Sequence, residues 1–227
     1  MVNRPFLDFY ASKSIIPVHQ DMSDITGHFA RRTALYHHLG VTMNCVRGRS
    51  VIEFGPGTGD NAVHISSWGP ALYVLVDGNP ASIEALKQKS AALLAKSEIH
   101  YSDILNYVDM RHFDVVLCEA LIPGQRQPAE FLQRIASFVA PSGLLVCTSI
   151  SPESYLAETC RRMILPIFAT HFPDLGARIE ALTRFFTPDL ESLPGMSRLH
   201  ADWVLDNIIH PHTSLGLFAM DEAIRTH

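Results

Sequence analysis

Cysteine and uninterrupted apolar sequence are both scarce in this chain. Only four cysteines occur among 227 residues, and no two of them have the Cys-x-x-Cys spacing of a metal or redox motif. No apolar run approaches the roughly 18 residues that a membrane-spanning helix needs, and the N-terminal stretch lacks the apolar core of a secretion signal. These absences predict a cytoplasmic protein with reduced thiols and no membrane partner.

Basic residues are also outnumbered. Lysine and arginine total 18 against 23 aspartates and glutamates, which gives a formal net charge of −5. An acidic chain offers no general positive field to a nucleic-acid backbone, which argues against nucleic acid as a partner. Hydrophobic residues make up 47% and charged residues 18%, the balance of a globular domain with a substantial core.

Five short apolar segments predict the strands of a parallel sheet. They are rich in β-branched and aliphatic residues, and they span 50–54, 71–77, 98–102, 113–119 and 143–150. Helical patterns lie between them, notably at 81–95 after Pro80 and at 129–139 after Pro128. Strands that are apolar on both faces and alternate with helices are typical of a doubly wound α/β fold, in which a mostly parallel sheet is covered by helices on both faces.

The segments that flank this centre predict helices. We expect one N-terminal helix within 18–39, with Ser23 or Asp24 as its cap and Gly40 as its stop. Residues 152–227 follow a helical period that several prolines interrupt, and they contain no convincing pair of strands.

The segment VIEFGPGTGD (51–60) places Gly55, Gly57 and Gly59 directly after the first strand. The dinucleotide fingerprint is Gly-x-Gly-x-x-Gly, and here Asp60 occupies the position of its third glycine. A carboxylate in the first helical turn would compete with a pyrophosphate for the positive end of the helix dipole. The loop is therefore better suited to a ligand that has no phosphate and a net positive charge.

This loop resembles the first motif of the class I S-adenosylmethionine-dependent methyltransferases, and the resemblance covers roughly residues 49–150. It implies that the glycine loop packs against the methionine part of the cofactor, that Asp77 binds the ribose hydroxyls, and that Asp103 and Ile104 hold the adenine. S-adenosylmethionine is the implied cofactor and S-adenosylhomocysteine the product. The cofactor-binding residues implied in this way are Glu53, Gly55, Pro56, Gly57, Thr58, Gly59, Asp60, Asp77, Gly78, Asn79, Asp103, Ile104, Glu119 and Ala120.

Four of these residues also suit simpler roles. Glu53 and Asp77 could be ordinary polar residues at strand ends, Asp103 could cap the helix that follows it, and Glu119 could be a solvated residue at the end of a strand. The resemblance divides the chain into an N-terminal helical lid segment (1–48), a cofactor-binding core (49–150) and a helical acceptor-binding or cap region (151–227).

The loop after the fourth strand, CEALIPGQ, limits the acceptor. It lacks the Asn/Asp-Pro-Pro-aromatic sequence of nucleic-acid amino-methyltransferases and the Pro-Cys nucleophile of cytosine C5 enzymes. We therefore expect methyl transfer to a small molecule by in-line displacement, with a protein side chain as the second class of acceptor.

An oxygen acceptor needs a group that takes its proton, and Glu119 and His28 are the first candidates. Residues of the N-terminal segment could close over the methionine end, and an arginine there could pair with the cofactor carboxylate; the candidates are His19, Asp21, His28, Arg31 and Arg32. In the C-terminal region, Asp202 and Asp206 would share one helix face, which could line the substrate or face solvent. His210 and His212 have no third ligand nearby, so we expect no metal.

One departure from the family pattern concerns the end of the sheet. We find no sixth or antiparallel seventh strand: residues 214–220 are the only late candidate, and the overlapping segment 218–227 suits a helix start better. Either the chain is a fragment or another chain completes the sheet edge, and an exposed edge favours a homodimer. Two other functions stay open: an NAD(P)-dependent oxidoreductase, which Asp60 argues against, and a non-catalytic partner subunit with the same fold.

Overall fold

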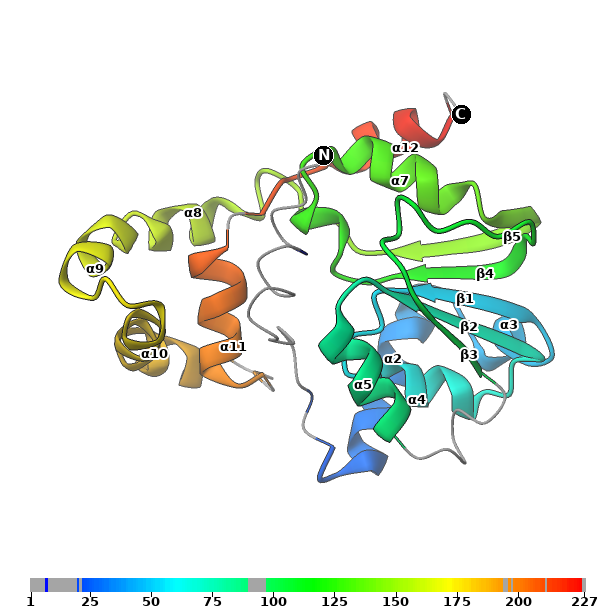
Figure 1. Ribbon diagram of the computed structural model, residues 1–227, viewed down its shortest axis with the longest axis horizontal. Coiled ribbons are helices and arrows are strands. Elements are labelled where there is room, and N and C mark those ends of the chain that lie inside the picture. The colour runs from blue at the N-terminus through cyan, green and yellow to red at the C-terminus, as the bar shows by residue number, and fades with distance from the viewer. Residues whose placement is uncertain are drawn as a thin grey trace.

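The computed structural model describes residues 7, 20, 22–89, 97–193, 196, 198–210 and 212–225. Within this part of the chain, five parallel strands form one sheet in the order β3-β2-β1-β4-β5 (Figure 1). The strands are β1 (Ser50–Phe54), β2 (Leu72–Asp77), β3 (Ser97–Tyr101), β4 (Phe113–Cys118) and β5 (Val139–Cys147). All five predicted strands and the doubly wound α/β fold are confirmed, although β5 begins four residues before the predicted start.

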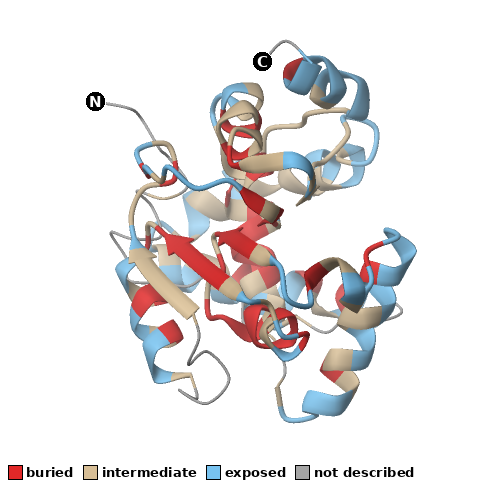
Figure 2. Ribbon diagram, turned by 90° about the vertical axis from the view of Figure 1, so that its right-hand side faces the viewer, coloured by how far each residue is buried: buried red, intermediate tan, exposed pale blue. Residues whose placement is uncertain are grey.

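Helices cover both faces of this sheet because successive strand residues point to opposite sides. In β1, Ile52 and Phe54 pack with the helices α7 (Pro128–Ala136) and α12 (Leu217–Arg225). Val51 points to the other face, which is covered by α2 (Ile25–His38), α3 (Met43–Val46), α4 (Asp60–Ser67) and α5 (Pro80–Gln88). Figure 2 shows the central strands as the most buried part of the structure.

Local sequence explains where two of these helices begin. The Asp24 carboxylate accepts a hydrogen bond from the Gly27 N–H at 2.8 Å and caps α2. Asn79 caps α5 through the Ala81 N–H at 3.0 Å, and Pro80 follows in the first helical position. The Asp24 cap agrees with the prediction from the sequence.

A group of helices lies beyond the carboxyl ends of the strands (Figure 1). It comprises α8 (Leu156–Arg162), α9 (Leu165–His171), α10 (Leu175–Glu191), α11 (His200–Val204) and the π-helical turn η2 (Leu205–Ile209). We call this group the cap. It has its own apolar core, in which Leu182 and Phe186 of α10 meet Trp203 and Ile208. The chain then returns to the sheet, because α12 packs on α7 and Ala223 belongs to the main core.

β5 forms one edge of the sheet, and the described residues after it contain no further strand. The expected helix start near residue 217 is confirmed by α12. Whether another chain covers the β5 edge, as the predicted homodimer would require, stays a prediction. None of the described helices combines the length and the apolar character needed to cross a bilayer.

Candidate functional site

The glycine loop follows β1 at the point where the strand order reverses, which is where open parallel sheets bind ligands. Gly55 has φ +71°, and a Cβ there would lie 2.8 Å from Cγ of Leu121. Gly59 has φ +79° directly before α4, and its Cβ would lie 2.6 Å from Cδ2 of Leu86. Both positions therefore require glycine for backbone conformation and for space.

Asp60 begins α4 and is buried. Its carboxylate accepts hydrogen bonds from the Thr58 hydroxyl at 2.5 Å and the Gln20 N–H at 3.1 Å, and it forms an ion pair with Lys89. The start of α4 is thus occupied by a carboxylate of the protein itself. This arrangement agrees with the sequence argument that a pyrophosphate would meet a competing negative charge here.

Two further buried carboxylates, Glu53 and Asp77, lie at the carboxyl ends of β1 and β2. Burial raises the pKa of Glu53 to about 7, although the hydrogen bond from the Tyr73 hydroxyl opposes this change. Burial raises the pKa of Asp77 to about 6. The hydrogen bonds that its carboxylate accepts from the N–H groups of Asn79 at 2.8 Å and Gly57 at 3.1 Å oppose this change. No described lysine or arginine forms an ion pair with either carboxylate.

Two pockets meet at the glycine loop. The inner pocket lies beside the ends of β2 and β3, and its lining includes Asp77, Gly78, Asn79, Ser82, Asp103 and Ile104. The outer pocket extends toward the cap, and its lining includes Glu53, Thr58, Asp60, Glu119, Arg198 and Asp206. Gly55, Gly57 and Leu121 line both. Of the fourteen residues implied to bind the cofactor and the two candidate bases, all but Gly59 and His28 line one of these pockets. Of the other candidates, Arg32 lines the outer pocket, whereas Arg31 and Asp202 line neither.

Glu119 lies at the outer pocket and is held from the N-terminal helix. Its Oε1 atom accepts hydrogen bonds from Nη2 of Arg32 and from the hydroxyl of Tyr36, both at 2.5 Å. The next residue, Ala120, has φ 59°, a left-handed conformation that is rare for a residue with a Cβ. This turn directs the chain away from β4 immediately after the carboxylate, as is common beside functional sites.

His28 does not reach the pockets. It is buried against α4, where its Nε2 atom lies 3.2 Å from the carbonyl oxygen of Asp60, and burial and nearby cations lower its pKa. The structure therefore gives no support to His28 as a base, and it places His28 at the contact between α2 and α4. His19 and Asp21 lie outside the described residues.

Other residues of the site carried no clear sequence signal. Arg198 follows the long helix α10 and reaches the outer pocket only because the cap lies beyond the carboxyl ends of the strands. Tyr36 and Tyr73, which bond the site carboxylates, follow the apolar period of their helix and strand. Asp103 combines two features, since it lines the inner pocket and its carboxylate also accepts from Leu105 N–H at 3.3 Å.

A family model described as a methyltransferase domain matches residues 28–186, which is more than half of the chain. The chain belongs to this methyltransferase family. A curated relative, the mitochondrial ubiquinone biosynthesis O-methyltransferase of Schizosaccharomyces pombe, is 26% identical over 178 residues, which are 72% of this chain. The chain spans 64% of the length of that relative.

Solved structures share the fold. The magnesium protoporphyrin IX methyltransferase of Synechocystis, with bound S-adenosylhomocysteine, has a TM-score of 0.53 and 18% identity over 70% of this chain and 76% of its own. PKMT2 from Rickettsia typhi has a TM-score of 0.59 and 17% identity over 79% of this chain and 38% of its own. The family match and the shared fold confirm the resemblance to class I S-adenosylmethionine-dependent methyltransferases.

Gly55 of the glycine loop should contribute to the stability of the fold. Gly55→Ala is expected to lower the free energy of unfolding by about 2 kcal/mol, because the new Cβ adopts an unfavourable φ and overlaps Leu121. Gly69→Ala is the matched control, since Gly69 has φ +73° but no atom within 4 Å of the place that a Cβ would take. Urea denaturation should show a loss of about 1 kcal/mol for Gly69→Ala. Equal losses in both variants would contradict the packing argument.

Proposed function

We propose that this methyltransferase transfers a methyl group from S-adenosylmethionine to a small-molecule acceptor held between the sheet and the cap. The observation that carries the proposal is the pair of buried carboxylates, Glu53 and Asp77, on either side of a glycine loop. Neither forms an ion pair with a described basic side chain, and burial raises both pKa values. Such carboxylates favour a ligand that brings positive charge and hydroxyl donors to the site.

The inner pocket suits the nucleoside part of this cofactor. We assign Asp77 to the ribose hydroxyls, supported by the Gly78 and Asn79 backbone, and Asp103 with Ile104 to the adenine. The loop residues Gly55, Pro56, Gly57, Thr58 and Gly59, together with Glu53, would then hold the methionine end. Asp60 supports this loop through Thr58 rather than through the cofactor.

At the outer pocket, Arg32 and Glu119 provide opposite charges for the carboxylate and ammonium groups of the methionine end. When bound, the cofactor supplies an electrophilic methyl group. The chain contributes orientation and the exclusion of water, because the cap residues Arg198 and Asp206 line the same pocket as Glu53 and Gly55.

Two observations favour a small acceptor. The pocket beside Glu119 is lined by the glycine loop, by Arg32 of α2 and by Arg198 and Asp206 of the cap, so three parts of the chain surround it. The curated relative is a biosynthetic O-methyltransferase. In this proposal residues 1–48 form a lid, 49–150 bind the cofactor, and the cap within 151–227 receives the acceptor.

The test uses S-adenosylmethionine labelled in its methyl group. The protein is incubated with a cell extract separated into small molecules and macromolecules, and the label is counted in each fraction. We expect transfer to the small-molecule fraction only. Transfer to protein would refute the proposed acceptor class, and cofactor binding without transfer to either fraction would indicate a non-catalytic partner subunit.

Cofactor affinity should depend on pH through Asp77. Its pKa of about 6 means that the carboxyl becomes neutral as the pH falls below 6, and a neutral carboxyl accepts ribose hydrogen bonds less well. Affinity for S-adenosylhomocysteine should fall about tenfold between pH 7.5 and pH 5 from this group. Calorimetry across this range should show that Asp77→Asn lacks that step. A variant with the same pH profile as wild type would contradict the assignment.

A further inference from the structure

The outer pocket contains a charged pair that the cofactor does not require. Nη2 of Arg198 lies 3.0 Å from Oδ2 of Asp206, and both side chains line the pocket from the cap. Asp206 is only 8% exposed. A buried ion pair costs desolvation and adds little stability by itself, so its position at the pocket calls for a functional explanation.

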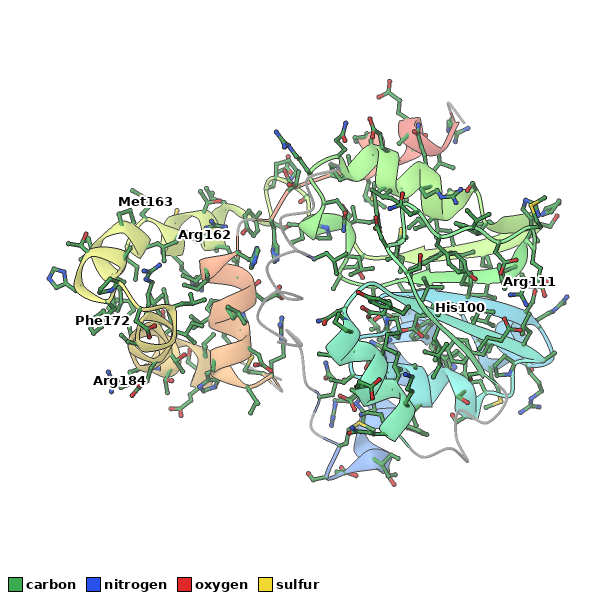
Figure 3. The ribbon with its side chains drawn as sticks, in the orientation of Figure 1. His100, Arg111, Arg162, Met163, Phe172 and Arg184 are labelled. Atoms are coloured by element: carbon green, nitrogen blue, oxygen red, sulfur yellow. The ribbon has the colours of Figure 1, made fainter. Side chains whose placement is uncertain are left out.

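The surroundings of Asp206 hold its carboxylate in place. It lies in the π-helical turn η2, a feature that often occurs at functional sites. Its Oδ1 atom lies 3.4 Å from Nε2 of His212, whose backbone N–H donates to the Tyr155 hydroxyl at 3.2 Å. Arg162 of α8, labelled in Figure 3, donates to the same hydroxyl at 3.2 Å and to the carbonyl of His210 at 2.9 Å. The turn is therefore braced from a neighbouring helix.

The carboxylate is also kept ionised. Burial alone would raise the pKa of Asp206, but the hydrogen bond with His212 and the charge of Arg198 outweigh this effect and lower it. Asp206 consequently presents a charged hydrogen-bond acceptor to the pocket.

The charge balance of the outer pocket restricts its second ligand. Among the described residues that line this pocket, three of the four carboxylates have a cationic partner, in the pairs Asp60–Lys89, Glu119–Arg32 and Asp206–Arg198. The fourth, Glu53, lies at the methionine end of the proposed cofactor site. The positive charge of Arg198 would repel an ammonium group placed beside Asp206. The Asp206 carboxylate would also keep that group protonated, and a protonated amine has no lone pair to accept a methyl group. A neutral hydroxyl can donate to Asp206 and accept from Arg198 at once.

We infer that Arg198 and Asp206 form the acceptor-binding pair, and that the acceptor presents an uncharged hydroxyl group to them rather than an amine. The inference rests on the proposed function, since it names the acceptor class of the same site. It makes the cap a determinant of specificity, with the cofactor held by the sheet.

The experiment measures binding of two probes, catechol and benzylamine, to the complex of the protein with S-adenosylhomocysteine. Wild type should bind catechol at least about tenfold more tightly than benzylamine. Asp206→Asn should weaken catechol about tenfold and change affinity for S-adenosylhomocysteine less than about twofold. Asp202→Asn is the matched control, because Asp202 lies one helical turn earlier, in α11, outside the described pocket lining.

Arg198→Gln provides a readout that a structural role would not give. Removal of this cation leaves Asp206 without its ion-pair partner, so the preference should shift toward benzylamine, whereas Arg198→Lys should retain the preference of wild type. An unchanged ratio in Arg198→Gln, or no catechol binding by wild type, would overturn the inference. If the ratio of catechol to benzylamine affinity shifts in Arg198→Gln, the charge preference of the pair is supported. If the methyl label of the earlier experiment is then found only in protein, the small-molecule acceptor is refuted.

Discussion

Asp77→Asn is expected to weaken S-adenosylhomocysteine binding by about 100-fold. In the ligand-free protein both carboxylate oxygens accept backbone N–H groups, from Asn79 at 2.8 Å and Gly57 at 3.1 Å, which fixes their orientation. Each hydrogen bond from a ribose hydroxyl to a charged oxygen contributes about 1.5–3 kcal/mol, and an amide replaces one such acceptor by a donor. Isothermal titration at pH 7.5 measures the loss directly.

The control for this variant is Asp109→Asn. Asp109 forms an ion pair with Arg111 at 2.6 Å, and Figure 3 shows Arg111 at the end of the sheet opposite the cap. The Asp109→Asn substitution should leave the affinity for S-adenosylhomocysteine within about twofold of wild type, since Asp109 lines neither pocket. A loss for Asp77→Asn no larger than that of the control would show that Asp77 does not contact the cofactor.

Arg32→Gln should produce the second large effect, on stability as well as on binding. The side chains of Arg32 and Glu119 are 12% and 25% exposed, so removal of the cation leaves a largely buried carboxylate, with the Tyr36 hydroxyl as its one remaining donor among the residues that the structure describes. Loss of one partner from such a pair should lower the free energy of unfolding by about 2 kcal/mol, less than for a fully buried pair. Denaturant titration provides the measurement.

The double variant Arg32→Gln/Glu119→Gln separates the pair from other contributions. Because it removes both charges, it should recover about 1 kcal/mol relative to Arg32→Gln alone. Cofactor affinity should stay low in the double variant, since both groups are proposed to bind the methionine end. Additive losses would mean that the two side chains do not stabilise one another.

The sequence predicted the sheet and the loop because their signals are local. Five apolar strands alternate with helices, and the order of glycines after Glu53 with Asp60 in the next turn depends only on neighbouring residues. The structure places these residues as expected, at the ends of β1 and β2 and the start of α4. Local caps such as Asn79 were predictable for the same reason.

Contacts between residues far apart in the sequence were harder to predict from it. His28 has the chemistry of a base, but the packing of α2 on α4 turns it toward the carbonyl of Asp60. Glu119 was recognised, whereas its contact with Tyr36, 83 residues earlier, follows from tertiary packing. The sequence raised two alternatives for Asp206, a substrate-facing side chain or a solvated one. The structure buries Asp206 beside Arg198, and neither residue's neighbours in the chain indicate that contact.

Calorimetric titration of the wild-type protein with S-adenosylhomocysteine, S-adenosylmethionine, NAD and NADP tests the central claim most directly. The glycine loop, with Asp60 in the helical turn after it and Asp77 at the end of β2, predicts one binding site per chain for the first two ligands and no saturable binding of either dinucleotide. Binding of NAD or NADP without binding of S-adenosylhomocysteine would contradict the account.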